Sequence, residues 1–247
     1  MGAILVNLVE RIESYWSKRS DDFYDLRIEE LKSDKRQLWQ DEIIANLPDE
    51  QHLTILDVGC GPGFFSIILA SAGYDVTAVD YTEEMLNKAK QNAGDLKDKI
   101  KFRRMDAHNL EFEEGEFDLI VTRNLTWNLK EPEKAYKSWY NVLRHGGKMI
   151  NFDADYGKVS LKEEMKSLGE EHAHNMMDSS LVKECDDIKQ ELEISKKRRP
   201  LWDEKYLQEI GFKSCKTDCE ISGRIYKTKD DFYNPTPMFK VRAVKNV

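Results

Sequence analysis

The chain has 247 residues, of which 40% are hydrophobic and 34% are charged, and its net charge is −8. This balance can bury a sizeable core under a solvated surface, which excludes global disorder. The negative charge repels phosphate backbones, so we expect no nucleic-acid partner. A membrane span needs about 18 or more apolar residues in a row, and the sequence has no such run. The start of the chain, MGAILVNLV, lacks the basic segment of a signal peptide, so we expect a cytoplasmic protein.

The first 50 residues favour helices. Apolar residues recur at helical spacing over residues 4–12 and again over residues 28–47, where Pro48 ends the pattern. Two helices are therefore predicted in front of the core.

The stretch over residues 53–69, LTILDVGCGPGFFSIIL, organises the rest of the chain. Its first six residues form a short apolar run that is typical of a buried strand of a parallel sheet. Gly59, Gly61 and Gly63 then allow a tight turn and a close approach of a ligand to the backbone. Helical spacing resumes over residues 64–72. A strand, a glycine loop and a helix together indicate a cofactor site, although the glycines could serve the turn alone.

The charges beside this loop narrow the choice of cofactor. The loop has a GxGxG pattern preceded by Asp57, whereas dinucleotide sites use GxGxxG and hold a pyrophosphate, which a carboxylate would repel. Asp80 follows a second apolar run about 20 residues on, where a carboxylate accepts hydrogen bonds from ribose hydroxyls. The two carboxylates favour a ligand with a cationic end and a ribose.

Further elements alternate along the chain as in an α/β sheet. Thr82 is expected to cap a helix that reaches residue 92 and stops at Gly94. Strands are predicted over residues 100–105 and 116–122, followed by a helix over 133–143, a turn at Gly146 and Gly147, and a strand over 148–152. A last helix over 200–210 and strands over 211–220 and 235–244 follow.

Residues 154–199 depart from this alternation. They are charged and favour helices, and they are longer than the usual connection in an α/β unit. We interpret them as an inserted helical cap that determines which substrate the protein accepts.

Four segments in order, LDVGCGPG, TAVDYTEEML, MDAHNLEFEEGEFDLIVTRN and LRHGGKMI, resemble the class I S-adenosylmethionine-dependent methyltransferases of the UbiE-like, or type 11, branch. The resemblance implies a Rossmann-like seven-stranded sheet flanked by helices, with its last strand inserted antiparallel. It implies S-adenosylmethionine as the cofactor, S-adenosylhomocysteine as its product, and a small-molecule acceptor. A single domain is expected, with an N-terminal helical lid (1–50), a cofactor-binding core (51–153), the cap (154–199) and the C-terminal part of the core (200–247).

The resemblance also implies roles for single residues. Asp57 and the three loop glycines would hold the methionine part, and Asp80 would hold the ribose. The remaining cofactor residues that it implies are Tyr81 and Met85 beside the adenosine, Asp106 and Ala107 at the adenine, and Asn124 near the methyl group. Trp127 follows Asn124 at the carboxyl edge of the sheet and is a candidate for contact with the acceptor.

Three further predictions keep more than one interpretation. In the family such aromatic residues as Tyr15 and Trp16 close on the methionine end, where a ring attracts a sulfonium, but they are equally suited to packing the helix. His172 and His174 are candidates for a general base, although a solvated helix face also fits their pattern. Glu170 and His174 lie at i,i+4, as two metal ligands could, but two ligands do not make a metal site. Met176 either lines an acceptor pocket or packs as an ordinary methionine.

Alternative functions also follow from the sequence. A methyltransferase of this fold could act on tRNA or protein, or it could be a non-catalytic sensor that binds the cofactor. Amino methylation of nucleic acids usually occurs behind an (N/D)-P-P-(Y/W) sequence, and this chain has TRNL there. A small-molecule acceptor is therefore the main prediction.

Overall fold

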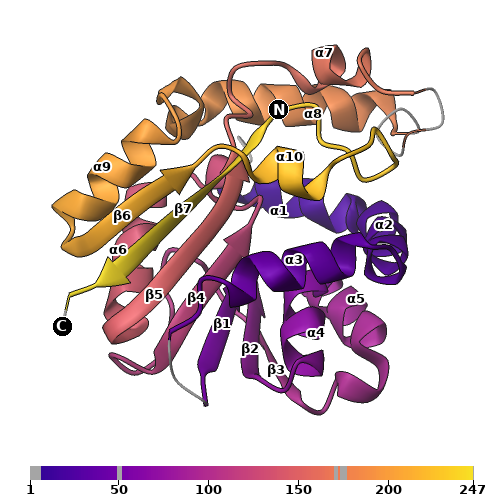
Figure 1. Ribbon diagram of the computed structural model, residues 1–247. Helices are drawn as coiled ribbons and strands as arrows, with labels where there is room; N and C mark the ends of the chain where they lie inside the picture. Colours follow the sequence, from indigo (N-terminus) through magenta and orange to yellow (C-terminus); the bar gives the residue numbers. More distant parts are fainter. Residues whose placement is uncertain (1–6, 49–51, 170–171, 173–176, 247) are drawn as a thin grey trace, which may run out of the picture.

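The computed structural model describes residues 7–48, 52–169, 172 and 177–246. They fold around a seven-stranded sheet with the order β3-β2-β1-β4-β5-β7-β6 (Figure 1). The strands are β1 (Thr54–Val58), β2 (Asp75–Asp80), β3 (Ile100–Arg104), β4 (Phe117–Arg123), β5 (Leu143–Ala154), β6 (Phe212–Asp218) and β7 (Met238–Lys245).

The direction of the strands follows the family pattern. β1 pairs in parallel with β2 and β4, and β2–β3 and β4–β5 are also parallel. β7 lies antiparallel between β5 and β6. The predicted seven-stranded sheet with an antiparallel last strand is therefore confirmed.

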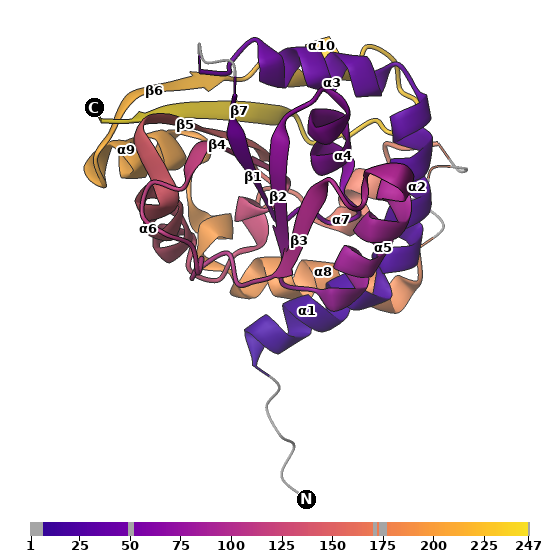
Figure 2. The ribbon, with the colours of Figure 1, turned by 90° about the horizontal axis from the view of Figure 1, so that it is seen from below.

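Helices cover both faces of this sheet (Figure 2). One face carries α3 (Lys35–Ile44), α4 (Phe64–Ser71), α5 (Glu83–Ala93) and α10 (Ile221–Ile225), and the other carries α6 (Pro132–Val142) and α9 (Leu201–Glu209). Trp39 and Phe65 pack edge to face with Phe152 of β5 on the first side. Tyr136 and Trp139 do the same with each other on the second side, and all five rings are buried. Both faces of the central strands are thus apolar, as their unbroken hydrophobic runs predict.

A third group of helices lies across the carboxyl edge of the central strands. α1 (Leu8–Lys18) and α2 (Ser20–Lys32) come from the lid, and α7 (Leu161–Met165) and α8 (Ser179–Glu191) come from the cap. Arg11 of α1 makes a bidentate ion pair with Glu184 of α8, with N–O distances of 2.8 and 3.1 Å, and also bonds Glu191. Lid and cap therefore meet each other above the sheet (Figure 1). Among the described residues, no helix combines the length and the hydropathy that a bilayer span needs.

Three local predictions differ from the structure. The helix expected over residues 28–47 is two helices, because the chain breaks at Ser33, whose hydroxyl bonds the carbonyl of Glu30 and the amide of Lys35. Thr82 precedes α5, but its side chain makes no capping bond. Gly146 and Gly147 do not separate α6 from a strand; they form an irregularity inside β5, which starts at Leu143.

The chain between β6 and β7 also differs from the prediction. The short helix α10 was not predicted, and β7 begins at Met238 rather than at residue 235. Both details lie away from the glycine loop.

Candidate functional site

The glycine loop turns at the carboxyl end of β1. The amides of Gly59 and Cys60 donate to the carbonyl of Val79 at 2.8 and 3.0 Å, which ties the loop to β2. Gly59 has a φ of 67°, and a Cβ there would lie 2.8 Å from the side chain of Leu125. A residue with a side chain would therefore be strained and crowded at this position. Gly61, in contrast, has nothing close to its Cα hydrogens and faces a cavity.

Asp80 is held by the backbone of this loop. Its Oδ2 accepts a hydrogen bond from the amide of Gly61, and its Oδ1 accepts one from the amide of Thr82, both at 2.9 Å. Burial raises the pKa of this carboxyl, and the two amide bonds oppose that rise. Each oxygen keeps acceptor capacity toward the cavity that Asp80 lines. The carboxylate is thus fixed in orientation, as a hydrogen-bond acceptor for a diol must be.

Asp57 lies at the end of β1 and is only 2% exposed. The hydroxyl of Ser66 donates to its Oδ2 at 2.5 Å. Burial raises the pKa of Asp57 to about 7, and the negative charge of Asp80 raises it further, while the bonds from Ser66 lower it. A cationic group placed in the cavity would favour the ionised form of Asp57.

Asp106 lies in the loop after β3 and is about half exposed. Its Oδ1 accepts the backbone amide of His108 at 2.9 Å and lies 2.6 Å from Nδ1 of the same histidine. Nε2 of His108 accepts the amide of Glu131 at 3.3 Å. This arrangement assigns the ring proton to Nδ1, so that it is donated to Asp106. The hydrogen bonds with His108 therefore hold Asp106 in place.

One cavity brings most of the predicted cofactor residues together. We call it the first cavity. Its lining includes Trp16, Asp57, Gly59, Gly61, Asp80, Tyr81, Met85, Asp106, Ala107 and Asn124. Gly63 lies behind it instead, at the start of α4, where its φ of 86° and the lack of a side chain let α4 approach Ala89 of α5.

A second cavity adjoins the first one beneath the cap. The two share the lining residues Trp16, Phe23, Arg27, Arg123 and Asn124. Tyr15, Trp127 and His172 line the second cavity and not the first.

Tyr15 is thus turned away from the predicted cofactor contact. Its ring is 3% exposed, and its hydroxyl accepts a hydrogen bond from Arg19 at 2.9 Å. Trp16, the next residue, lines both cavities and packs edge to face with Phe23 and Trp127. Neighbouring residues of a helix point about 100° apart, and here Trp16 lines the first cavity whereas Tyr15 does not.

Asn124 has a φ of 55°, which is uncommon for a residue other than glycine. Its carbonyl accepts the indole N–H of Trp127 at 2.9 Å, and its Oδ1 accepts the hydroxyl of Tyr156 at 3.1 Å. The strained turn lets β4 end at the wall between the two cavities.

Of the three remaining site candidates, the structure describes one. His172 lines the second cavity, and burial lowers its pKa, so that its neutral form dominates near neutral pH. His174 and Met176 lie outside the described residues.

The sequence interpretation missed a buried charge cluster in the shared wall. Glu30 is fully buried and accepts hydrogen bonds from both Arg27 and Arg123, the latter at 2.9 and 3.1 Å, and from the indole of Trp39 at 3.2 Å. Burial would raise the pKa of Glu30, but the charges of Arg123 and Arg27 hold it below its ordinary value. Arg123 is the last residue of β4, and this position at the edge of the sheet was the available signal.

Comparisons with known proteins agree with this architecture. Residues 56–151 match the family profile described as a methyltransferase domain. The ubiquinone/menaquinone biosynthesis C-methyltransferase UbiE of Rickettsia bellii is 32% identical over 151 residues, which are 58% of this chain and 60% of that protein. The ubiquinone biosynthesis O-methyltransferase of Coxiella burnetii is 32% identical over 106 residues, 41% of this chain and 45% of that one. The chain thus spans about 60% or less of the length of these curated relatives.

Solved structures show the same fold at low identity. A putative S-adenosylmethionine-dependent methyltransferase from Methanococcus maripaludis superposes with a TM-score of 0.62 at 20% identity, covering 100% of this chain and 98% of that one. Phosphoethanolamine N-methyltransferase 2 of Haemonchus contortus, solved with S-adenosylmethionine, gives 0.59 at 19% identity, covering 85% of this chain and 52% of that one. The segment that matches the family profile, residues 56–151, begins in β1 and ends in β5, so it contains the glycine loop, Asp80 and Asp106. The fold, the motifs and the relatives together place the methyltransferase domain of this chain among the class I S-adenosylmethionine-dependent methyltransferases, in their UbiE-like branch.

Proposed function

We propose that the protein binds S-adenosylmethionine in the first cavity and transfers its methyl group to a small molecule in the second. The observation that carries the proposal is the carboxylate of Asp80, fixed by the amides of Gly61 and Thr82 at the edge of that cavity. A fixed carboxylate accepts both hydroxyls of a ribose without losing conformational entropy when the ligand binds.

Other residues of the first cavity fit the rest of this cofactor. Asp57 offers a buried carboxylate to the cationic methionine end. Burial raises its pKa, and no cationic group among the described residues lowers it again. Asp106, oriented by His108, offers an acceptor to the amino group of an adenine, next to the amide of Ala107. Tyr81 and Met85 supply apolar surface for the purine.

The bound sulfonium supplies an activated methyl carbon: a lone pair of the acceptor bonds to that carbon, the carbon–sulfur bond breaks, and its electron pair stays on sulfur. The protein then has to align the acceptor and exclude water. Trp16 and Trp127 form an aromatic wall at the place where the two cavities meet. His172 is our candidate for accepting the proton that the acceptor loses, because burial favours its neutral form.

The acceptor is proposed to be small. The second cavity is lined by residues of both the lid and the cap, a setting that suits a small molecule. The net charge of −8 also disfavours a nucleic acid.

Calorimetric titration with S-adenosylmethionine and S-adenosylhomocysteine tests the proposal. Asp80→Ala is expected to weaken binding by about 1.5 to 3 kcal/mol, or about 10- to 150-fold, the value of hydrogen bonds to a charged group. Asp75→Ala is the matched control, because Asp75 is an exposed aspartate at the opposite end of the same strand. Its affinity should equal that of the wild type. A folded wild-type protein that binds neither ligand would refute the proposal, as would equal losses in the two variants.

A further inference from the structure

The residues that line both cavities indicate the chemistry of the methyl acceptor. This inference rests on the function proposed above. A cofactor in the first cavity can reach an acceptor only through this wall. Its shared residues combine rings with cationic side chains, namely Trp16, Phe23, Arg27 and Arg123. The rings and the positive charges both limit which molecules the second cavity can bind.

The wall carries more positive than negative charge. Arg27 and Arg123 share the single carboxylate of Glu30, which leaves this buried cluster with a net charge of +1. Arg123 uses its two terminal nitrogens on Glu30 and Tyr226, at 2.9 to 3.1 Å. Its Nε is buried and has no hydrogen-bond partner within the described part of the chain.

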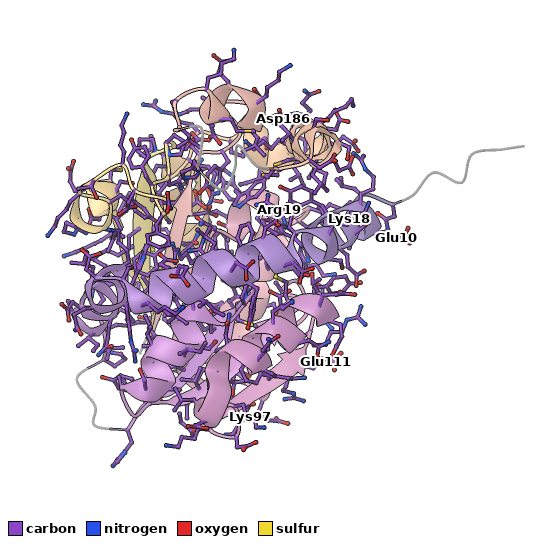
Figure 3. The ribbon with its side chains drawn as sticks, turned by 90° about the vertical axis from the view of Figure 1, so that its right-hand side faces the viewer. Glu10, Lys18, Arg19, Lys97, Glu111 and Asp186 are labelled. Atoms are coloured by element: carbon purple, nitrogen blue, oxygen red, sulfur yellow. The ribbon has the colours of Figure 1, made fainter. Side chains whose placement is uncertain are left out.

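Arg19 adds a second positive charge at the start of α2. It is only 4% exposed, and its guanidinium lies 4.9 Å from the ring centre of Phe23. One terminal nitrogen donates to Tyr15, but Nε finds no hydrogen-bond acceptor among the residues that the structure describes. The nearest carboxylate, the exposed Asp22, is 3.6 Å away from this nitrogen. Figure 3 shows Arg19 on the side of the lid that faces the cap.

The other charged residues described around the second cavity are one lysine and two carboxylates. Lys189 lies 4.0 Å from Glu164 and also donates to the carbonyl of Val159 at 3.1 Å. Asp231 is exposed at the rim. Among the described residues, the three arginines of the lid and the shared wall therefore have the buried Glu30 and the exposed Asp22 as their counter-ions.

Buried N–H groups without acceptors are costly, and for a guanidinium the cost is larger than for a neutral donor. Two such groups in one aromatic cavity call for an anionic acceptor of hydrogen bonds. We propose that the methyl acceptor is an aromatic molecule with an anionic substituent, a carboxylate or a phosphate, which Arg19 and Nε of Arg123 bind while the rings around them pack on its arene.

Ligand-observed NMR titration of the protein saturated with S-adenosylhomocysteine tests this inference. The probes are 4-hydroxybenzoate, its neutral amide 4-hydroxybenzamide, and phenyl phosphate. At least one anionic probe is expected to bind about tenfold or more tightly than the amide, which corresponds to one charge-assisted hydrogen bond. The tighter of the two anions distinguishes a carboxylate from a phosphate.

Variants at α1 and α2 assign the effect to Arg19. Arg19→Gln should reduce the preference for the anion to about threefold or less, and Arg19→Lys should keep part of it, because it keeps the charge. Lys18→Gln is the matched control: it removes an exposed positive charge one residue away and should change nothing. Arg19 lines only the second cavity, so S-adenosylhomocysteine should bind all variants equally, which also reports that they are folded.

The outcomes separate the two proposals. If S-adenosylhomocysteine does not bind, the proposed function fails. If it binds but the anions bind no better than the amide, if no probe binds, or if the preference survives in Arg19→Gln, the inference of an anionic aromatic acceptor is wrong.

Discussion

Replacing Asp57 with asparagine is expected to stabilise the ligand-free protein at neutral and alkaline pH while it weakens binding of the cofactor. The carboxyl is 2% exposed, and its pKa is raised from the ordinary 3.8 to about 7. Asparagine has nearly the same shape and stays neutral. Its amide oxygen can keep the hydrogen bond from Ser66, so the substitution removes little besides the charge.

The sign of the pH dependence follows from proton linkage. Between the two pKa values the folded state keeps a proton on Asp57 that the unfolded state releases, so this group lowers the stability as the pH rises. The loss is small near pH 4 and complete above the folded-state pKa. Each pKa unit corresponds to about 1.4 kcal/mol, so Asp57→Asn should gain on the order of 4 kcal/mol near pH 8.

Urea denaturation of both proteins near pH 4 and near pH 8 measures the difference. The gain should be well below about 1 kcal/mol at the lower pH and several-fold larger at the higher pH. Asp75→Asn, at the exposed end of β2, serves as the control for a general effect of charge and should show no such rise. A gain that is equal at the two pH values, or a variant less stable than the wild type near pH 8, would show that folding does not raise the pKa of Asp57.

Two further predictions concern stability. Glu30→Gln leaves two buried guanidiniums without their carboxylate and should destabilise the fold by about 3 to 5 kcal/mol in urea denaturation, whereas a loss below about 1 kcal/mol would mean that the cluster is hydrated. Gly63→Ala should lose about 1 to 3 kcal/mol, because a Cβ there would lie 3.0 Å from that of Ala89 on a backbone with positive φ. Gly73→Ala is its control, since Gly73 also has a positive φ but has open space around it. If both variants lose the same stability, the close approach of α4 and α5 does not contribute to the loss.

The sequence predicted the sheet and the first cavity because both depend on local patterns. Apolar runs followed by glycine or aspartate identify the buried strands and their carboxyl ends, and those ends necessarily meet at one edge of a parallel sheet. Asp57 and Asp80 lie in β1 and β2, and Asp106 follows β3; these three strands are neighbours in the sheet. Their convergence therefore required only the strand order of the family.

The lid and the second cavity could not be predicted in the same way. Their residues come from segments far apart in the sequence, such as Arg11 of α1 and Glu184 of α8, and no local periodicity encodes such a pairing. The break at Ser33 was missed for a related reason: helical periodicity continues on both sides of it, and only the side-chain bonds to the backbone mark the end of α2. In the sequence, Glu30 looks like a solvated charge on the surface of a helix. Only the folded structure shows Arg123 of β4 beside it.

The features that oppose stability are found among the residues that line the two cavities. Asp57 is a buried carboxyl without a cationic partner among the described residues, and the buried Nε atoms of Arg19 and Arg123 lack hydrogen-bond acceptors there. Asn124, between them, holds a positive φ. Such departures from a well-satisfied core are expected at functional sites, where the ligand supplies the missing partner. A cationic cofactor above Asp57 and an anionic acceptor beside the arginines would satisfy both sets of groups at once. Their opposite charges would also attract each other across the shared wall, which favours binding of the cofactor and the acceptor at the same time.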